Sequence, residues 1–147
     1  MKPCILPWIN FGTNIYGRPR VCGYSDIEAQ WKSMFEKRGL PWPPTKIEDT
    51  PKEILESDFA KEFQSWNGKL QNSSVTEQWN GIYFREIREA FLNNEWPANC
   101  NRCKHVEELG GESKRMDENH MWFNEDLITE TDYPRHIDVR TGTVCNF

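Results

Sequence analysis

The chain has 147 residues, of which 18 are basic and 23 are acidic, and its net charge is -5. Only 37% of the residues are hydrophobic, yet 13% are aromatic, which is enough for a small core and excludes disorder of the whole chain. The net negative charge disfavours general nucleic-acid binding, which requires a basic surface. No stretch approaches the roughly 20 apolar residues of a membrane span, and the first residues lack the apolar run of a signal peptide. We therefore expect a cytoplasmic protein, with one domain or one domain and the start of another.

The charge is unevenly distributed along the chain. Residues 1–70 carry ten basic and nine acidic side chains, whereas residues 71–147 carry eight and fourteen. Such asymmetry usually indicates solvated surface, and an acidic docking face is the alternative.

The first expected element is a β-hairpin within residues 1–24. Its parts are two short strands and a connecting turn, at Trp8–Phe11, Arg20–Cys22 and Asn14–Gly17. Gly17 can take the positive φ that such a turn requires. The hairpin would bring Cys4 and Cys22 near one end.

Helices are expected over most of the remaining chain. The predicted helices are Ser25–Arg38, one beginning at Thr50, Ser74–Asn94, one from Cys103 to Leu109, and Glu112–Trp122. The third begins with a capping box, Ser74-Val-Thr-Glu77, and Pro97 prevents its continuation. Its buried stripe is predicted to be Val75, Trp79, Tyr83, Ile87 and Phe91. With a strand expected over His136–Arg140, the fold class is α+β, with the helices arranged around a cysteine site.

Five cysteines are present: Cys4, Cys22, Cys100, Cys103 and Cys145. An odd number without a secretion signal is a poor disulfide framework. Cys100 and Cys103 form a C-x2-C pair, a spacing that lets two thiolates converge on one metal or cluster. Together with Cys4 and Cys22 they make two pairs, which suit either Zn²⁺ or an iron–sulfur cluster.

Other roles for these residues remain open. A redox dithiol at Cys100 and Cys103 would leave Cys4 and Cys22 unexplained. The four thiols can also be read as buried apolar groups. His105 and His120 are possible ligands, although surface or capping roles fit them better.

The combined pattern resembles the SPASM/twitch family, the auxiliary-cluster domains of radical SAM enzymes. The shared opening is Cys4-Ile-Leu-Pro-Trp8, then Gly17, and then Cys22 after four intervening residues. The later motifs that resemble the family are Gly68-Lys-Leu70, Ser74-Val-Thr-Glu-Gln-Trp-Asn80, Arg85-Glu-Ile-Arg88 and Cys100-Asn-Arg-Cys103. The resemblance covers residues 4–24 and 68–111, and residues 25–66 look like an insertion without chemistry of their own.

The resemblance implies one auxiliary [4Fe-4S] cluster. Full SPASM domains have further cysteines after the C-x2-C pair, and none lies between Cys103 and Cys145, which favours the shorter twitch type. The implied ligands are the two cysteine pairs, Cys4 with Cys22 and Cys100 with Cys103. The cluster would relay electrons or position a substrate. Arg18, Arg20, Arg102 and Lys104 flank the ligands and would offset the charge of a thiolate-bound cluster.

The last residues resemble the first strand of a radical SAM core. Asp138-Val-Arg-Thr-Gly-Thr-Val-Cys145-Asn-Phe147 looks like a barrel strand followed by the first cysteine of a C-x3-C-x2-C loop. Residues 1–124 are then the auxiliary domain, and residues 133–147 begin a truncated core in which Cys145 is a partial cluster motif.

A truncated chain of this kind is expected to be inactive alone. In the family, the complete core binds a second [4Fe-4S] cluster and cleaves S-adenosylmethionine to a radical. A full-length parent would therefore be a radical SAM enzyme with an electron donor, and often a peptide or protein substrate. The alternative is a structural zinc module that mediates protein contacts through the same four cysteines.

Overall fold

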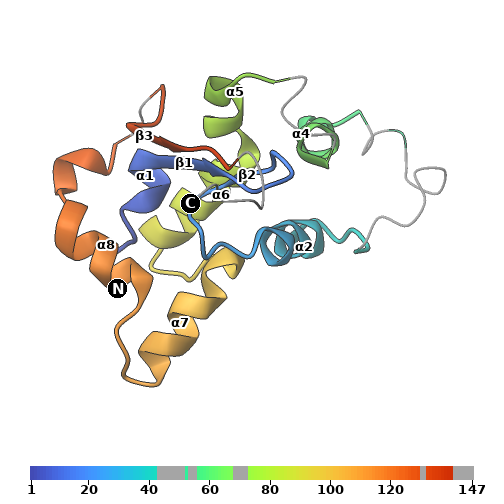
Figure 1. Ribbon diagram of the computed structural model, residues 1–147. Helices are drawn as coiled ribbons and strands as arrows, with labels where there is room; N and C mark the ends of the chain where they lie inside the picture. Colours follow the sequence, from blue (N-terminus) through green and yellow to red (C-terminus); the bar gives the residue numbers. More distant parts are fainter. Residues whose placement is uncertain (43–51, 53–55, 68–72, 130–131, 141–147) are drawn as a thin grey trace.

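The computed structural model describes residues 1–42, 52, 56–67, 73–129 and 132–140 (Figure 1). The helices are α1 (Leu6–Ile9), α2 (Ile27–Lys37), α4 (Asp58–Asn67), α5 (Val75–Trp79), α6 (Ile82–Leu92), α7 (Asn101–Glu108) and α8 (Lys114–Trp122). Two 3₁₀ turns are η3 (Ala98–Cys100) and η4 (Glu125–Leu127), and the strands are β1 (Asn10–Thr13), β2 (Pro19–Arg20) and β3 (His136–Asp138). The expected α+β class is confirmed.

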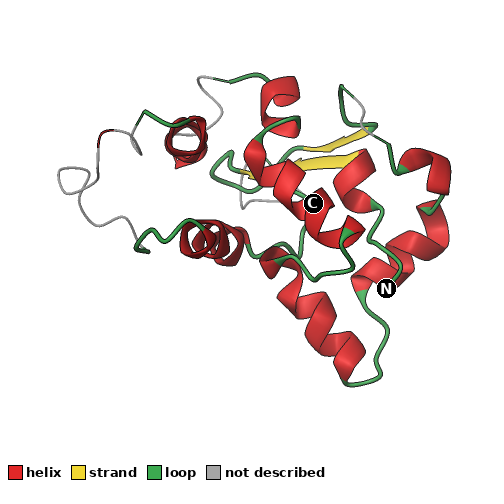
Figure 2. Cartoon of the chain, turned by 180° about the vertical axis from the view of Figure 1, so that it is seen from behind, coloured by secondary structure: helices red, strands yellow, loops and turns green. Residues whose placement is uncertain are grey.

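A small mixed sheet with strand order β2-β1-β3 joins the two ends of the described chain. β1 pairs with β2 in antiparallel register, with Gly12 opposite Arg20, and with β3 in parallel register, with Phe11 opposite Ile137. Figure 2 shows the strands with helices gathered around them. Strand β3, which covers the first three residues of the predicted strand His136–Arg140, therefore lies in the same sheet as the N-terminal hairpin.

The core forms where α1, α2, α4 and α6 meet the sheet. Phe11 of β1 stacks on Phe84 of α6, with ring centroids 5.6 Å apart, and α6 also packs against α1. Trp31, Phe84 and Ile87 are completely buried. Removing this aromatic surface from water is the main driving force for assembling so small a domain.

The expected hairpin forms, but the prediction of a strand from Trp8 to Phe11 is wrong at its start. Residues 6–9 form the short helix α1, and the strand begins only at Asn10. Pro7 lies in the first turn of α1, where its fixed φ favours a helix and its missing N–H costs nothing. The turn is as predicted, because Gly17 has a φ of 74° and the Asn14 side chain accepts hydrogen bonds from the turn backbone.

The predicted helix Ser74–Asn94 is divided into α5 and α6 at Asn80 and Gly81. The capping box at Ser74 and Glu77 is present, and the stripe from Trp79 to Phe91 is buried as predicted. The Glu62 carboxylate accepts hydrogen bonds from the first two backbone N–H groups of α6, at 2.5 and 2.9 Å. A Cβ at Gly81 would lie 2.6 Å from the Glu62 carboxylate, so only glycine allows this approach. A side chain distant in sequence thus starts a new helix.

Residues 25–66, predicted to be an insertion, belong to the core where the structure describes them. Trp31 of α2 contacts Phe59, Phe63 and Trp66 of α4, with ring centroids 5.1 to 5.8 Å apart. Trp31 also stacks on Tyr83, with ring centroids 5.6 Å apart. The start of the helix predicted at Thr50 falls outside the described residues.

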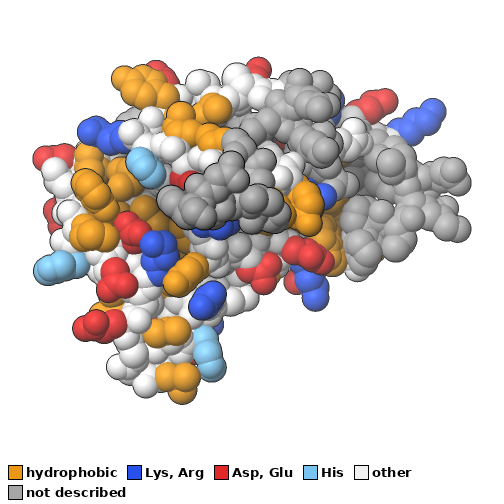
Figure 3. Space-filling view, viewed as in Figure 1, with side chains coloured by type: hydrophobic (Ala, Val, Ile, Leu, Met, Phe, Trp, Pro, Cys, Tyr) orange, Lys and Arg blue, Asp and Glu red, His pale blue; other side chains and the backbone are white. Residues whose placement is uncertain are grey.

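The surface carries both signs of charge. On the face in Figure 3, acidic and basic side chains are interspersed, and exposed hydrophobic side chains lie among them. Met121 and Trp122, at the end of α8, are among the exposed ones. None of the helices in the described ranges has the length and apolar character that crossing a membrane requires.

We predict that Trp31→Ala lowers the free energy of unfolding by about 3 to 5 kcal/mol, because it removes the ring that joins α2 and α4 to α6. Urea denaturation followed by circular dichroism measures this change. The matched control is Leu92→Ala on the surface of α6, which should change stability by less than about 0.5 kcal/mol. Equal effects of the two substitutions would contradict the role assigned to Trp31.

Candidate metal centre

Cys4 lies just before α1, and its neighbours are fixed by a side chain that is distant in sequence. Asn119 of α8 accepts a hydrogen bond from the Ile5 N–H at 2.8 Å and donates one to the Pro3 carbonyl at 2.7 Å. The backbone on both sides of Cys4 is therefore fixed. The Leu6 N–H donates to the Cys4 sulfur, and the residue is only 6% exposed.

Cys22 is positioned by a short polar network after β2. The Cys22 N–H donates to Ser25 Oγ at 3.1 Å, and the same hydroxyl lies 3.5 Å from Cys22 Sγ. The side-chain amide of the buried Asn99 donates to Ser25 Oγ at 3.5 Å. Ser25 thus connects the hairpin to the residue immediately before Cys100.

The C-x2-C pair lies where η3 continues into α7. The Cys100 N–H donates to the Pro97 carbonyl at 2.9 Å, and Cys103 follows one helical turn later, 9% exposed. The backbone of Asn99 is fixed to α2, because its N–H donates to the Gln30 side chain and its carbonyl accepts from the Asp26 N–H. The prediction of a helix beginning at Cys103 is thus corrected to one that begins at Asn101 and includes Cys103.

These elements bring the four predicted ligands into one neighbourhood, which we call the four-cysteine site: Cys4, Cys22, Cys100 and Cys103. All four are free cysteines. The Cys100 thiol interacts electrostatically with each of the other three, and the Cys4 thiol with Cys22 and Cys103. Three segments that are far apart in sequence therefore converge here. That the cysteines act as ligands stays a prediction, and Cys145 lies outside the described residues.

Within the described ranges, no group of three or more His, Cys, Asp or Glu side chains is placed to hold a metal ion. A tetrahedral zinc with Zn–S bonds of about 2.3 Å needs sulfurs about 3.8 Å apart. An iron–sulfur cluster places each thiolate on a different iron and so spreads the sulfurs more widely. The expected minor role of His105 and His120 agrees with their exposure on α7 and α8.

Burial opposes the ionisation of two of these thiols, those of Cys4 and Cys100. Removal from water raises the pKa of Cys4 from 9.0 to about 12, with smaller contributions from Cys22 and Cys103. Burial followed by the three neighbouring thiols likewise raises the pKa of Cys100 well above its ordinary value. Soft, desolvated sulfurs of this kind favour a thiophilic metal, whose binding must expel their protons.

One cation beside the thiols is Arg115 of α8, which the sequence analysis did not identify. Its Nε and Nη2 atoms donate to the two carboxylate oxygens of Glu107, at 2.8 and 2.5 Å, and a third nitrogen donates to the Lys2 carbonyl. Arg115 lowers the pKa of both Cys4 and Cys100. Burial opposes ionisation of Glu107, but hydrogen bonds from Arg115 and Ser113 bring its pKa below the ordinary value. The pair therefore remains charged beside the site.

The four cations predicted to flank the ligands have different surroundings. Arg20 interacts electrostatically with Cys22, whereas Lys104 pairs with Glu108 on the exposed side of α7. Arg18 and Arg102 lie over aromatic rings instead, those of Trp66 and Tyr24.

The Tyr83 hydroxyl is close enough to the Cys100 and Cys22 thiols to interact with them electrostatically. Tyr83 is buried in the core as predicted, but its hydroxyl has no hydrogen-bond partner within the described part of the chain. Burial, then the Cys100 and Cys22 thiols, raise the pKa of Tyr83 well above its ordinary value. The side chain of Asn99 is beside it and lowers that pKa, without meeting hydrogen-bond geometry. The neutral hydroxyl is thus a donor that needs an acceptor.

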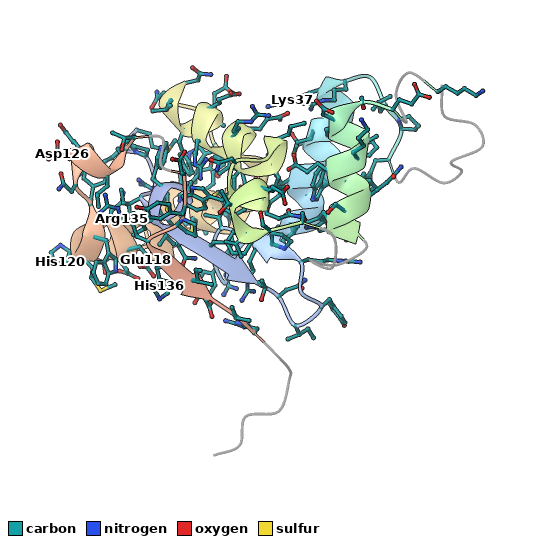
Figure 4. The ribbon with its side chains drawn as sticks, turned by 90° about the horizontal axis from the view of Figure 1, so that it is seen from above. Lys37, Glu118, His120, Asp126, Arg135 and His136 are labelled. Atoms are coloured by element: carbon teal, nitrogen blue, oxygen red, sulfur yellow. The ribbon has the colours of Figure 1, made fainter. Side chains whose placement is uncertain are left out.

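Cys22 also borders a cleft of about 500 Å³ between α8 and β3. Figure 4 shows Glu118, Arg135 and His136 near one another on this side of the molecule. Glu118 pairs with Lys114 at 2.5 Å, and His136 Nδ1 lies 2.6 Å from Asn10 Oδ1. The cleft offers a route by which a molecule can approach the four-cysteine site.

No protein-family model, curated protein or solved structure matches this chain. The resemblance to the SPASM/twitch family therefore depends on the motifs of the sequence itself.

We predict that the metal-free protein loses stability as the pH rises from about 9 toward 12. Over this range the unfolded Cys4 thiol ionises while the folded one, with a pKa raised from 9.0 to about 12, keeps its proton. The folded state then binds more protons than the unfolded state, so the free energy of unfolding falls with pH. Urea denaturation at several pH values measures the slope.

The matched control for this prediction is Cys4→Ala. Lysine and tyrosine groups also titrate in this range, and they contribute equally to both proteins. The variant should show a shallower fall than the wild-type protein, and identical slopes would contradict the pKa shift of Cys4.

Proposed function

We propose that this chain binds one [4Fe-4S] cluster at the four-cysteine site and serves as the auxiliary-cluster domain of a radical SAM enzyme. The observation that carries the proposal is the convergence of four free thiols from three distant segments. Four cysteine thiolates are the usual ligand set of such a cluster. In this proposal Cys145 is the first ligand of a second cluster in the core of the parent enzyme.

The surroundings of the sulfurs support a cluster. The Leu6 N–H donates to Cys4, and the Tyr83 hydroxyl faces two other ligands with its donor unused by any described residue. The buried guanidinium of Arg115 supplies positive charge. Hydrogen bonds to sulfur and nearby cations are the means by which proteins stabilise and tune anionic clusters.

When bound, the cluster supplies one-electron transfer. If one thiolate is displaced, it also supplies an iron with an open coordination position for a substrate. With all four thiolates bound, every iron of the cluster has a cysteine ligand and none is open to a substrate. Electron relay is then the role that fits best. The cleft beside Cys22 would receive the electron donor or part of the parent enzyme's substrate, which in this family is often a peptide or protein. S-adenosylmethionine would be cleaved by the core of the parent, and not by this chain alone.

Anaerobic isolation with separate counts of iron, sulfide and zinc tests the proposal. We expect about four irons and four sulfides per chain, with brown absorbance in the visible region. Cys100→Ser should abolish or strongly reduce the absorbance, whereas Cys145→Ser should retain it and serves as the matched control. A colourless protein with one zinc per chain would indicate a structural zinc module. Full absorbance in Cys100→Ser would contradict the ligand assignment.

We predict that Tyr83→Phe makes the reduction potential of the cluster more negative. The substitution removes a hydrogen-bond donor directed at the sulfurs, and such donors stabilise the reduced, more negative cluster. A redox titration monitored by electron paramagnetic resonance measures the potential, and the iron content should not change.

The matched control for Tyr83 is Tyr16→Phe in the exposed hairpin turn, where the side chain is 61% exposed. This variant should leave the potential unchanged. An unchanged potential in Tyr83→Phe as well would show that the hydroxyl does not donate to the cluster.

A further inference from the structure

The cleft beside Cys22 is built by several elements and not by a single loop. It has a volume of about 500 Å³, and its walls come from α1, β1, α8, η4 and β3. In Figure 4, Glu118 of α8 and His136 of β3 lie near one another on this side of the molecule. The volume is in the range of small-molecule sites. Because the fold itself sets these walls, the cleft is formed before any ligand binds.

Much of the wall is apolar. Leu6, Ile9 and Leu127 supply aliphatic side chains, and Trp122 supplies an aromatic ring. Trp122 is 57% exposed, so its indole retains apolar surface that a ligand in the cleft can cover. Covering such surface is a main favourable term in binding, and an exposed indole pairs well with a second aromatic ring. These residues favour a ligand that carries a ring.

The charged groups of the cleft are balanced. Lys114 and Glu118 form an ion pair with each other at 2.5 Å, one turn apart on α8. The other carboxylate of the lining, Asp138, is 4.0 Å from the Arg20 guanidinium, and the other cation is Arg135. With two cations and two carboxylates in the lining, no excess charge selects an anion or a cation. A neutral ligand therefore fits the cleft.

His136 supplies a hydrogen-bond acceptor, and Asn10 determines which ring nitrogen that is. The side-chain amide of Asn10 donates to the Val21 carbonyl at 2.6 Å, so its Oδ1 atom is the one that faces His136. His136 Nδ1 lies 2.6 Å from this oxygen and must carry a proton, because Oδ1 can only accept. In the neutral imidazole, Nε2 is then an acceptor. No described residue donates to it.

A phenol matches these features together. Its ring suits the indole and the aliphatic wall, it is uncharged, and its hydroxyl is a donor. We propose that this cleft binds a small neutral phenol, with the ring against Trp122 and the hydroxyl donating to His136 Nε2.

The bound phenol would lie beside the four-cysteine site, because Cys22 lines the same cleft. The inference thus names the chemical class that the cleft of the proposed function recognises, and in that respect it rests on the proposed function. Binding itself depends only on the walls of the cleft.

Equilibrium dialysis of the anaerobically isolated full chain against 4-methylphenol tests this inference. The comparison compound is 4-methylanisole, in which a methyl ether replaces the hydroxyl, so the ring and the oxygen remain but the donor is lost. We expect saturable phenol binding with a dissociation constant of about 1 mM or lower, and about tenfold weaker binding of the ether. Absence of saturable phenol binding, or equal binding of the two compounds, would overturn the proposal.

Substitutions locate the site. Trp122→Ala and His136→Leu should each weaken phenol binding about tenfold, and His136→Leu should also abolish the preference for the phenol over the ether. Trp122 is exposed, so its substitution keeps the test valid if His136→Leu fails to fold.

The matched controls are Met121→Ala and His120→Leu, which change the same helix, α8, outside the cleft. Both should leave the affinity unchanged. An equal loss of affinity in the controls, or a preference for the phenol that persists in a folded His136→Leu protein, would contradict the site.

Iron content, measured in the same samples, separates this proposal from that of the cluster. Phenol binding by a protein without iron would support the cleft and contradict the cluster. A protein with a full cluster that binds no phenol would overturn the cleft proposal alone.

Discussion

The arrangement of this protein depends on the convergence of four cysteine thiols at the meeting point of three chain segments, where Cys4 and Cys103 are buried and Cys22 and Cys100 are half-buried. Removal from water raises the pKa of Cys4 and Cys100, so these two thiols resist ionisation. Neutral thiols contribute little beyond apolar contact. If the sulfurs become thiolates, as the proposed cluster requires, the polar groups around them can stabilise the negative charge.

Most of the supporting interactions join segments that are distant in sequence, and one joins the neighbouring helices α7 and α8. Asn119 fixes the backbone around Cys4, Ser25 and Asn99 connect Cys22 to Cys100, and the pair of Arg115 and Glu107 joins α8 to α7. None of these contacts alone is worth more than a few kcal/mol. Together they fix the surroundings of the four-cysteine site, which would position the sulfurs for the proposed cluster.

The aromatic core and the site share one residue. Tyr83 packs its ring against Trp31 and presents its hydroxyl to the thiols. Residues of α2 and α4 therefore help to fix the ring of Tyr83 beside the site, although none of the four cysteines belongs to these helices. The segment predicted to be an insertion therefore connects the aromatic core to a residue that lies beside the thiols.

The sequence alone determined the α+β class, the hairpin turn, the capping box at Ser74 and the cysteines that come together. These features depend on local rules of spacing, capping and periodicity, which act between neighbouring residues. Only the tertiary structure decided that Glu62 starts a separate helix at Gly81, that α1 replaces the first part of a strand, and that Trp31 belongs to the core. Arg115, Asn119 and the orientation of the Tyr83 hydroxyl were likewise beyond the sequence. Their partners lie far along the chain, and no local pattern records which polar group a buried side chain will meet.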